Sequence, residues 1–482
     1  MRKNVIVILN KQEEYSMKKL CLLLTLVMLI GLTGCGKSET KTDTKKETIS
    51  QTNEAETTEE EIVFSDAVKI ELSNSEILVD GEKISEDTES AVYKAKDIIF
   101  YLENQGITYG EGSQKDEHSQ IEADAHTVVH ITEPGVYEVS GTLEAGQIFV
   151  DLGDGTKDEE EAVATLVLNN ANITCTVAPA ILFYRTYECA GDIEKEDAVM
   201  DVDTAAAGAN IVLAEESKNK IYGSYVAEIY EEYELSEDGT EVTDSKKLHK
   251  YDGAIYSRRS MNISGNGKLE VVAENEGIGS EMHLTINGGE IYIKSGNDGI
   301  NASKEDISVF AMNAGELNIQ VTGETGEGDG IDSNGWLVIN GGDVKSFACA
   351  TSMDAGIDAD KGIYINGGTV VATGNMPAEI ADGKLTAMVF SSKEKLEAGE
   401  KYEVKNAAGD VIMEISPKNT CTMLVVASEA IIAEDTYTLW QDDTEFAVGF
   451  SGPMEMFHPG MRPNGERPSM PEKMTPPEKP KK

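Results

Sequence analysis

The 482-residue chain carries 41 basic and 87 acidic residues, which gives it a formal net charge of −46 at pH 7. A surface this acidic repels the phosphates of nucleic acids and anionic lipid head groups, so neither is an expected partner. The same charge would attract divalent cations, although a solvated acidic surface on an exported protein explains the composition equally simply.

The N-terminus has the pattern of an export signal. Met17-Lys18-Lys19 supplies a basic start, residues 20–32 form an apolar run, and Leu32-Thr33-Gly34-Cys35 follows. The run is too short for a transmembrane span with these flanks. It resembles a bacterial lipobox, which implies that residues 1–34 are a signal peptide and that Cys35 becomes lipidated, anchoring the protein outside the cytoplasm to the cell membrane by its lipid alone. An ordinary signal with an accidental cysteine is the alternative, and residues 1–16 are either a miscalled start or a real extension.

Two segments lack the apolar residues that a folded core needs. Residues 35–61 are rich in Thr, Glu and Lys, so we expect a flexible linker there. Residues 451–482 are dominated by Pro, Met and charged residues and predict a disordered tail. Residues 62–125 are expected to supply an N-terminal cap and the first irregular coils.

Two motifs recur through the second half of the chain. The pattern N-(G/A)-G begins at positions spaced by 26, 27 and 26 residues, namely Asn287, Asn313, Asn340 and Asn366. A small residue followed by Ile recurs as well, at Ile181, Ile255, Ile278, Ile300, Ile331 and Ile357. Self-similarity at this period is typical of a solenoid, in which each repeat buries its apolar edge against its neighbours.

Within each repeat the apolar residues alternate with polar ones, as in Leu284 and Ile286 or Leu337 and Ile339. Alternation between turns of Gly, Asn and Asp predicts strands rather than helices. The pattern of leucine-rich repeats and the nonapeptide calcium repeat are both missing. We therefore predict an all-β chain whose residues 62–384 form a right-handed parallel β-helix, with insertions near 185–209 and 225–250 and with the Ile column as an interior ladder.

Residues 385–450 depart from the repeat pattern. They contain alternating runs such as 422–426 and 436–440, separated by Gly-Asp and Asp-Asp turn signals. We predict a small β-rich C-terminal domain that caps the last coil, because the ends of a solenoid need polar covers.

Several segments together resemble a known family. These are residues 135–143 and 146–151, Ala180-Ile181, the N-G-G turns and the D-G-I-D motifs. They resemble secreted bacterial carbohydrate-binding β-helix proteins, best known from cellulose-degrading clostridia and built like pectate lyases. The resemblance covers roughly residues 65–445 and implies calcium sites and binding of cellulose- or pectin-like polysaccharides. The long insertions depart from the family, and Ala355 stands where it usually has an aspartate.

Acidic side chains form columns when the repeats are aligned on the Ile ladder. Two positions before the Ile lie Glu276, Asp298, Asp329 and Ala355, and one position after it lie Gly279, Asn301, Asp332 and Asp358. Carboxylates stacked about 4.8 Å apart repel by about 3 kcal/mol at an effective dielectric near 20. A Ca²⁺ ion would reverse that sign, and we predict as its ligands Asp298, Asn301, Asp329, Asp332 and Asp358. The alternative is that Asp-Gly merely makes good turns with each carboxylate facing water.

Three of the six arginines, Arg185, Arg258 and Arg259, fall at one turn of the repeat. Such a cationic strip could hold uronate carboxylates or could neutralise the protein's own acids. If the protein were a lyase like the family's structural relatives, Arg258 or Arg259 would be its base. No histidine belongs to a catalytic motif.

Sugar rings stack on exposed aromatic side chains, and aromatic residues of any kind are scarce here, at 6% of the chain. We predict a sugar-binding role for four of them, Tyr256, Tyr292, Trp336 and Tyr364, against the alternative that each is ordinary surface or turn packing.

Among the cysteines, Cys175 and Cys189 flank an insertion and could form a disulfide, while Cys349 and Cys421 have apolar, core-like surroundings. No C-x-x-C pair exists, which argues against zinc and thioredoxin-like chemistry.

The sequence therefore favours a cell-surface lipoprotein that binds polysaccharide through a calcium-containing β-helix without cleaving it. A calcium-dependent, pectate-like polysaccharide lyase is one alternative, and a structural or adhesive surface protein is the other.

Overall fold

A computed structural model of the protein describes residues 66–381, 383–433 and 435–451. All of them belong to the unit Val63–Lys482. The predicted signal peptide, Cys35, the 35–61 linker and all but the first residue of the 451–482 tail lie outside the described residues. No helix in the described ranges is both long and apolar enough to cross a membrane.

The described chain is nearly all β, as predicted. Its helical content is one short helix, α2 (Gln120–Ala125), and one 3-10 turn, η1 (Thr156–Asp158). Helix α2 begins with a capping box, in which the Ser119 side chain accepts from the Glu122 backbone and the Glu122 carboxylate accepts from the Ser119 backbone.

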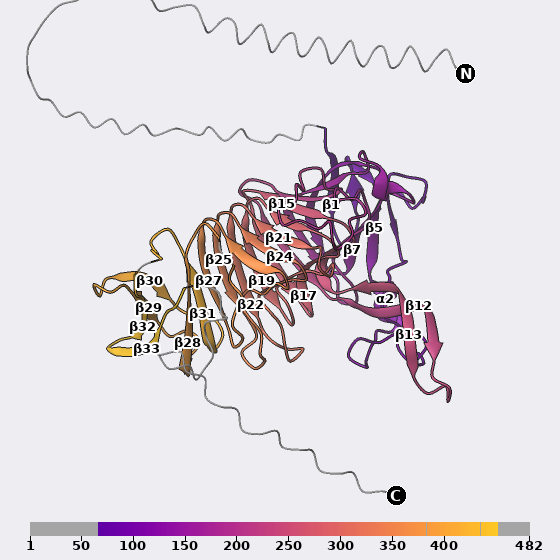
Figure 1. The fold of residues 1–482 in the computed structure, drawn as a ribbon. Helices are drawn as coiled ribbons and strands as arrows, with labels where there is room; N and C mark the ends of the chain where they lie inside the picture. The colour runs from indigo at the N-terminus through magenta and orange to yellow at the C-terminus, as the bar shows by residue number, and fades with distance from the viewer. Residues whose placement is uncertain (1–65, 382, 434, 452–482) are drawn as a thin grey trace, which may run out of the picture. The chain divides into compact units, whose positions relative to one another are not determined.

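Strands of successive repeats pair in parallel and form three columns (Figure 1). The first column contains β11 (Lys218–Gly223), β16 (Lys268–Ala273), β19 (Glu290–Ser295), β22 (Glu316–Val321), β25 (Asp343–Phe347) and β27 (Thr369–Gly374). The second contains β10 (Ala209–Leu213), β15 (Met261–Gly265), β18 (Leu284–Ile286), β21 (Val309–Met312), β24 (Trp336–Ile339) and β26 (Gly362–Ile365). The third contains β5 (Thr127–Ile131), β7 (Gly146–Asp151), β9 (Ile181–Arg185), β14 (Gly253–Ser257), β17 (Glu276–Ser280), β20 (Ile300–Ala302) and β23 (Ile331–Ser333).

The N-terminal strands close one end of this stack. They are β1 (Val68–Leu72), β2 (Leu78–Val79), β3 (Glu82–Lys83), β4 (Val92–Ala95), β6 (Gly135–Leu143) and β8 (Ala164–Thr174). Strand β8 is long enough to pair with both β10 and β11, so it joins the first and second columns. Strand β4 runs antiparallel to β5 and ends the third column.

Isoleucine side chains fill the interior behind the third column. Strand register places Ile148, Ile181, Ile255, Ile278, Ile300, Ile331 and Ile357 in line, and all are fully buried. The prediction that the Ile column is an interior ladder is confirmed. β-Branched side chains suit this position because they pack well on a pleated surface.

The N-(G/A)-G turns stack into a ladder of amides. The Nδ2 group of Asn313 donates to Asn287 Oδ1 at 2.8 Å, Asn340 donates to Asn313 at 2.9 Å, and Asn366 donates to Asn340 at 2.9 Å. The last residue of each motif has positive φ, between +81° and +94°, where glycine is favoured. Each repeated turn is therefore fixed by the turns on either side of it.

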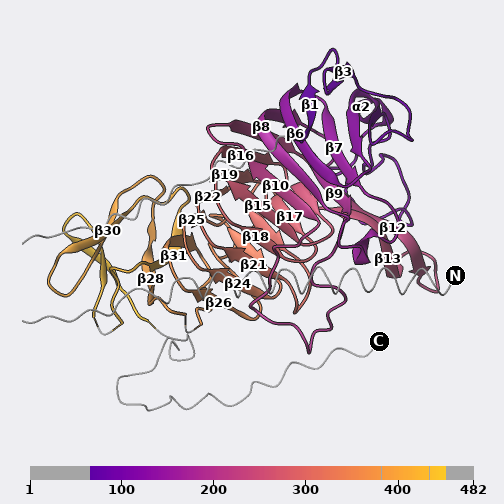
Figure 2. The ribbon, with the colours of Figure 1, turned by 90° about the horizontal axis from the view of Figure 1, so that it is seen from above.

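The two predicted insertions lie between columns. The first is the connection from β9 to β10, and the second is the long antiparallel hairpin of β12 (Val226–Leu235) and β13 (Val242–Tyr251), which extends away from the stack (Figure 2). Cys175 and Cys189 are both free thiols, so they do not form the disulfide that the sequence left open.

The C-terminal strands leave the parallel pattern. Strands β28 (Ala387–Leu396) and β31 (Cys421–Ala427) are antiparallel, and β31 also pairs antiparallel with β27. A four-stranded antiparallel sheet follows, made of β29 (Tyr402–Lys405), β30 (Val411–Ile415), β32 (Thr438–Gln441) and β33 (Thr444–Val448). These strands enclose a hydrophobic cluster of their own, around residues such as Tyr402 and Tyr437.

Alanine substitutions at two glycines with similar φ can distinguish the stability cost of backbone strain from the stability cost of crowding between coils. A Cβ at Gly342 (φ +83°) would lie 2.7 Å from Gly315 O, whereas a Cβ at Gly81 (φ +79°) would meet nothing within 4 Å. We expect Gly81→Ala to lower the free energy of unfolding by about 1 kcal/mol and Gly342→Ala by roughly 2 kcal/mol more. Urea unfolding of both variants measures the difference, and equal losses would mean that the close approach of the coils costs nothing.

Candidate functional site

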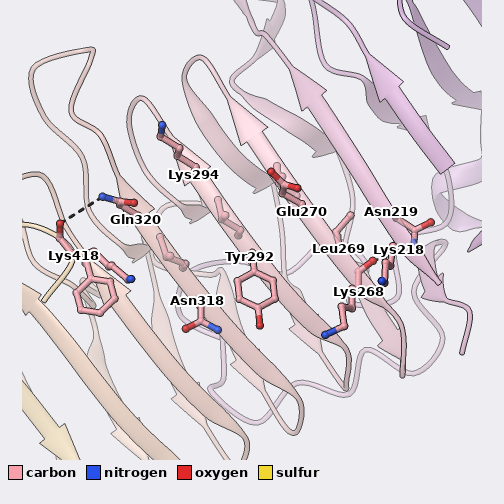
Figure 3. A pocket seen from close by; sticks show the side chains of 14 residues that line it. Lys218, Asn219, Lys268, Leu269, Glu270, Tyr292, Lys294, Asn318, Gln320 and Lys418 are labelled. Carbon is pink, nitrogen blue, oxygen red and sulfur yellow. Dashed lines mark hydrogen bonds between the residues drawn. The ribbon is translucent and has the colours of Figure 1, made fainter. Parts of the chain in front are cut away.

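A groove of about 480 Å³ runs across the outer face of the first column (Figure 3). Alternate residues of β16, β19 and β22, such as Leu269, Ile291 and Leu317, are buried, so the residues between them point outward. The outward side chains that line the groove are Lys268, Glu270, Tyr292, Lys294, Asn318 and Gln320.

Tyr292 lies at the centre of this groove, and its side chain is 40% exposed. Its neighbours across the strands are Glu270 on β16 and Asn318 on β22. The ring is therefore an apolar platform between a carboxylate and an amide. This is the placement that the sequence predicted for Tyr292, at an outward strand position.

The groove is locally cationic in a strongly acidic protein. Its lining contains four lysines, Lys218, Lys268, Lys294 and Lys418, against the single carboxylate of Glu270. That carboxylate is 2.9 Å from Lys220 Nζ, which offsets its charge. Lys268 in turn forms an ion pair with Glu290, which offsets the charge of that lysine. The groove can therefore accept both hydroxyl groups and negatively charged groups.

The far end of the groove is closed by the segment that precedes β31. Asn419 Nδ2 donates to Val321 O and to Ala348 O, both at 2.7 Å. Gln320 Nε2 donates in turn to Asn419 Oδ1 at 3.2 Å. The C-terminal region thus fixes one wall of the groove.

The predicted metal ligands lie at a different place, in the third column. Carboxylate oxygens of Asp329, Asp332 and Asp358 lie within 4.8 Å of one another. Asn301 is the strand partner of Asp332, which places its amide on the next coil. Asp298 accepts the backbone N–H of Asp329 at 2.7 Å. The fold brings the predicted column together.

The acidic cluster combines buried carboxyl groups with an amide oxygen that has no hydrogen-bond partner. Burial and the nearby carboxylates raise the pKa of Asp329 to about 8 and those of Asp332 and Asp298 to about 7, and burial also raises the pKa of Asp358. Asn301 Nδ2 donates to Glu276 Oε1 at 2.9 Å, but the buried Asn301 Oδ1 has no hydrogen-bond partner. Carboxylate and amide oxygens are the donors that Ca²⁺ takes, so these residues fit that ion.

Beyond the acidic cluster, a row of acidic side chains continues through Glu276 and Asp252 toward the β12–β13 hairpin. The Glu276 carboxyl is buried beside Asp252 and Asp298, and burial raises its pKa well above the usual value. Lys250 Nζ lies 3.4 Å from Asp252 Oδ2, and this aspartate raises the pKa of Lys250. A lysine thus serves as counter-ion at this end of the row. Sequence reasoning missed Lys250, because the hairpin lies outside the repeat and leaves no periodic signal.

The arginines are not brought to the acidic cluster. Arg258 and Arg259 follow β14, which is three strands, or roughly 14 Å, from β23. Arg258 Nε lies 3.6 Å from Glu281 Oε1, and Arg185 Nε lies 2.5 Å from Asp151 Oδ1. These contacts agree with the alternative that the arginines neutralise the protein's own acids.

The four predicted sugar-binding aromatics are divided among three faces. Tyr292 lies on the first column, and Trp336 and Tyr364 lie partly exposed on the second, where Lys361 Nζ is 4.7 Å from the centre of the Trp336 ring. Tyr256 is only 3% exposed and packs on Tyr251, with 5.6 Å between ring centres. The prediction for Tyr256 is wrong, because the β12–β13 hairpin supplies a covering ring that the repeat pattern could not indicate.

Comparisons with known proteins agree with a carbohydrate-binding assignment. The family model of the carbohydrate-binding domain-containing proteins matches residues 125–224 and 192–412, which together span well over half of the chain. A protein of Acetivibrio thermocellus with the same description is 34% identical over 168 residues, which cover 35% of this chain and 45% of that protein. The present chain thus spans less than half the length of that relative.

One solved structure is also similar, a gadolinium derivative of the polysaccharide lyase-like protein from C. thermocellum. It is 22% identical in sequence, the match covers 65% of this chain and 91% of that one, and the TM-score is 0.34.

Asp332→Asn provides a pH test of the acidic cluster. Because the folded-state pKa of Asp332 is raised, its contribution to stability is present below about pH 4 and is lost as the pH rises through about 7. With a chelator present, we expect the free energy of unfolding of the wild type to fall relative to that of the variant between about pH 4 and pH 7, by at most about 1.4 kcal/mol per pH unit.

Urea unfolding at several pH values measures this difference. Asp343→Asn, which removes an exposed carboxylate from β25, controls for the loss of one negative charge. Parallel pH curves for the wild type and Asp332→Asn would contradict the expectation.

Proposed function

This chain belongs to the carbohydrate-binding domain-containing protein family, and on that premise we propose that it binds polysaccharide without cleaving it. The protein in this proposal is a lipid-anchored surface protein, whose columns of parallel strands form a right-handed β-helix that holds calcium.

The groove around Tyr292 is the observation that carries the proposal. An exposed aromatic ring offers the apolar face on which a sugar ring can stack, and amide and lysine side chains on both sides can bond sugar hydroxyls. Lys218, Lys294 and Lys418 also offset the repulsion that a −46 chain exerts on an acidic glycan. Of the two polysaccharide classes that the sequence analysis names, these lysines favour a pectin-like polysaccharide over a cellulose-like one.

Calcium is proposed at the acidic cluster, held by Asp298, Asn301, Asp329, Asp332 and Asp358. Support comes from the close approach of three carboxylates and from the unpaired oxygen of Asn301. When bound, the ion would neutralise carboxylates whose mutual repulsion otherwise opposes the stacking of three successive coils. The chain's own contribution is to hold these oxygens at fixed strand positions.

We propose that the protein does not cleave polysaccharide because of the positions and protonation of the basic side chains around the acidic cluster. A lyase needs a base that can accept a proton from the sugar close to the cation. Arg258 and Arg259 lie three strands away, and Asp252 raises the pKa of Lys250, so that lysine keeps its proton. These features favour binding over a lyase reaction.

Retention on polysaccharide tests the groove. We expect the purified full chain to be retained on polygalacturonate, and Tyr292→Ala to weaken retention about tenfold, since stacking on an aromatic ring contributes of the order of 1 kcal/mol or more. Tyr233→Ala is the matched control, because Tyr233 is 47% exposed but lies on the β12–β13 hairpin.

The same assay separates the other functions. Unsaturated sugars in the supernatant would show that the protein is a lyase and would contradict the binding proposal. A parallel measurement on cellulose shows whether the protein prefers an acidic polysaccharide to a neutral one. Failure of the wild type to bind either polysaccharide would leave the structural or adhesive role.

Calcium binding is tested by calorimetry and thermal unfolding. We expect Ca²⁺ to raise the melting temperature of the full chain, because a ligand bound only by the folded state stabilises it. Asp329→Asn and Asp332→Asn should each lower calcium affinity by about tenfold or more, as they remove charged ligands. Asp343→Asn is again the control. Equal calcium affinity in the wild type and all three variants would exclude the acidic cluster as the calcium site.

Lipid anchoring at Cys35 is tested in bacterial cells that are fed a labelled fatty acid. We expect label on the wild-type chain and release of the protein from the membrane fraction in Cys35→Ser. A labelled Cys35→Ser chain would show that the lipid is attached elsewhere.

A further inference from the structure

A second cavity, of about 520 Å³, lies on the outer face of the second column. It lies between residues 200–205, which belong to the insertion before β10, and strands β18, β21 and β24, all labelled in Figure 2. The strand partners Ala311 and Val338 give it an apolar floor, and the lining reaches Asn366 on the next coil. At about 4.8 Å per coil the cavity is about 14 Å long, which matches an extended chain of four or five residues.

Hydrogen bonds fix residues 200–205, the roof of this cavity, over the strands. Thr204 Oγ1 lies 2.8 Å from Thr285 Oγ1 and 2.8 Å from Asn262 Oδ1. Asn262 Nδ2 donates to Thr204 O at 2.7 Å. Because Thr204, Thr285 and Asn262 are all buried, the roof is a fixed part of the cavity.

The charged side chains of the lining are mainly acidic. Asp201 and Asp203 belong to the roof and are exposed, while Lys384 is the one cation among the lining residues. His283 also lines the cavity, and burial lowers its pKa, so it counts as neutral. The net charge of the lining is therefore −2 + 1 = −1, and it suits a segment that carries both basic and apolar side chains.

Residues 452–482, the C-terminal segment, carry charge of the opposite sign to the rest of the chain. They contain six basic and four acidic residues, a net charge of +2. The other residues contain 41 − 6 = 35 basic and 87 − 4 = 83 acidic ones, a net charge of −48. The segment also contains eight of the 12 prolines and five of the 17 methionines. It thus combines basic with apolar side chains, and its prolines reduce the entropy lost when an extended segment binds.

The described chain ends beside this cavity. Ser451, its last residue, lines a smaller cavity of about 210 Å³ together with Lys384, and Lys384 also lines the larger cavity. Arg462 follows Ser451 by 11 positions, which is a reach of up to about 36 Å. A tether this short gives an effective concentration of millimolar order, so even a weak contact can form within one molecule.

We propose that the C-terminal segment of this chain binds in the cavity, with apolar side chains on the floor and with Arg462 or Arg467 paired with the roof carboxylates of Asp201 and Asp203. The bound segment covers the outer face of the second column across three strands. This contact goes beyond the proposed function, because it involves neither the Tyr292 groove nor calcium.

Amide hydrogen exchange of the full chain tests this contact by charge reversal. Asp201→Lys changes the net charge of the lining from −1 to +1, and Arg462→Glu with Arg467→Glu changes that of the segment from +2 to −2. We expect either reversal alone to speed exchange at residues 200–205 about threefold or more, because like charges then face each other. The two reversals together should restore slow exchange, because the charges are again opposite.

Glu234→Lys with Glu237→Lys is the matched control for a change of two charges. Both glutamates are exposed and belong to the β12–β13 hairpin, so their reversal should leave exchange at residues 200–205 unchanged. Asp203 is kept in every variant, since its Oδ1 also accepts the Ala205 N–H at 2.9 Å.

A measurement on the unaltered chain covers the case in which a variant fails to fold. Raising the salt concentration from about 0.1 M to about 1 M shortens the Debye length from about 10 Å to about 3 Å. Exchange at residues 200–205 should then become faster, while exchange in β7 stays the same.

Equal exchange at residues 200–205 in both salt concentrations, or in the folded reversal variants and the wild type, would overturn the contact. Slow exchange that depends on protein concentration would overturn it too, because the segment in the cavity would then belong to a second copy of the chain.

Discussion

Parallel pairing of equivalent strands is the constraint on which the rest of this structure depends. It places the same position of successive repeats side by side, at a separation of about 4.8 Å. For the buried isoleucines this repetition gives a continuous apolar interior, and for the asparagines it gives a chain of amide hydrogen bonds. For the aspartates it gives repulsion, which the fold tolerates only where protons or a cation offset it.

The same geometry explains why each candidate site has its own face. Alternation along every strand turns one set of side chains inward and leaves the other set to define the surface of its column. The first column carries lysines and Tyr292, the second carries the asparagine ladder and a cavity with carboxylates, and the third carries the acidic cluster. A chain with a net charge of −46 can therefore present a cationic groove, since charge is sorted by column rather than spread evenly.

The interruptions of the repeat shape these faces further. The β12–β13 hairpin covers Tyr256 and brings Lys250 to one end of the acidic row. The insertion before β10 forms the roof over His283, and the segment before β31 closes the Tyr292 groove. In each case a segment that does not repeat converts an open strand surface into an enclosed one.

The sequence by itself determined the all-β class, the interior isoleucine column and the gathering of Asp329, Asp332 and Asp358, because all three follow from spacing within a repeat. It also placed Tyr292 outward, since alternation alone decides that. Only the tertiary structure decided that Tyr256 is buried, that Arg258 stands apart from the acidic cluster, and that His283 lines a cavity. The physical reason is that these outcomes depend on insertions and on distances between coils, and contacts with a segment outside the repeat leave no periodic signal in the chain.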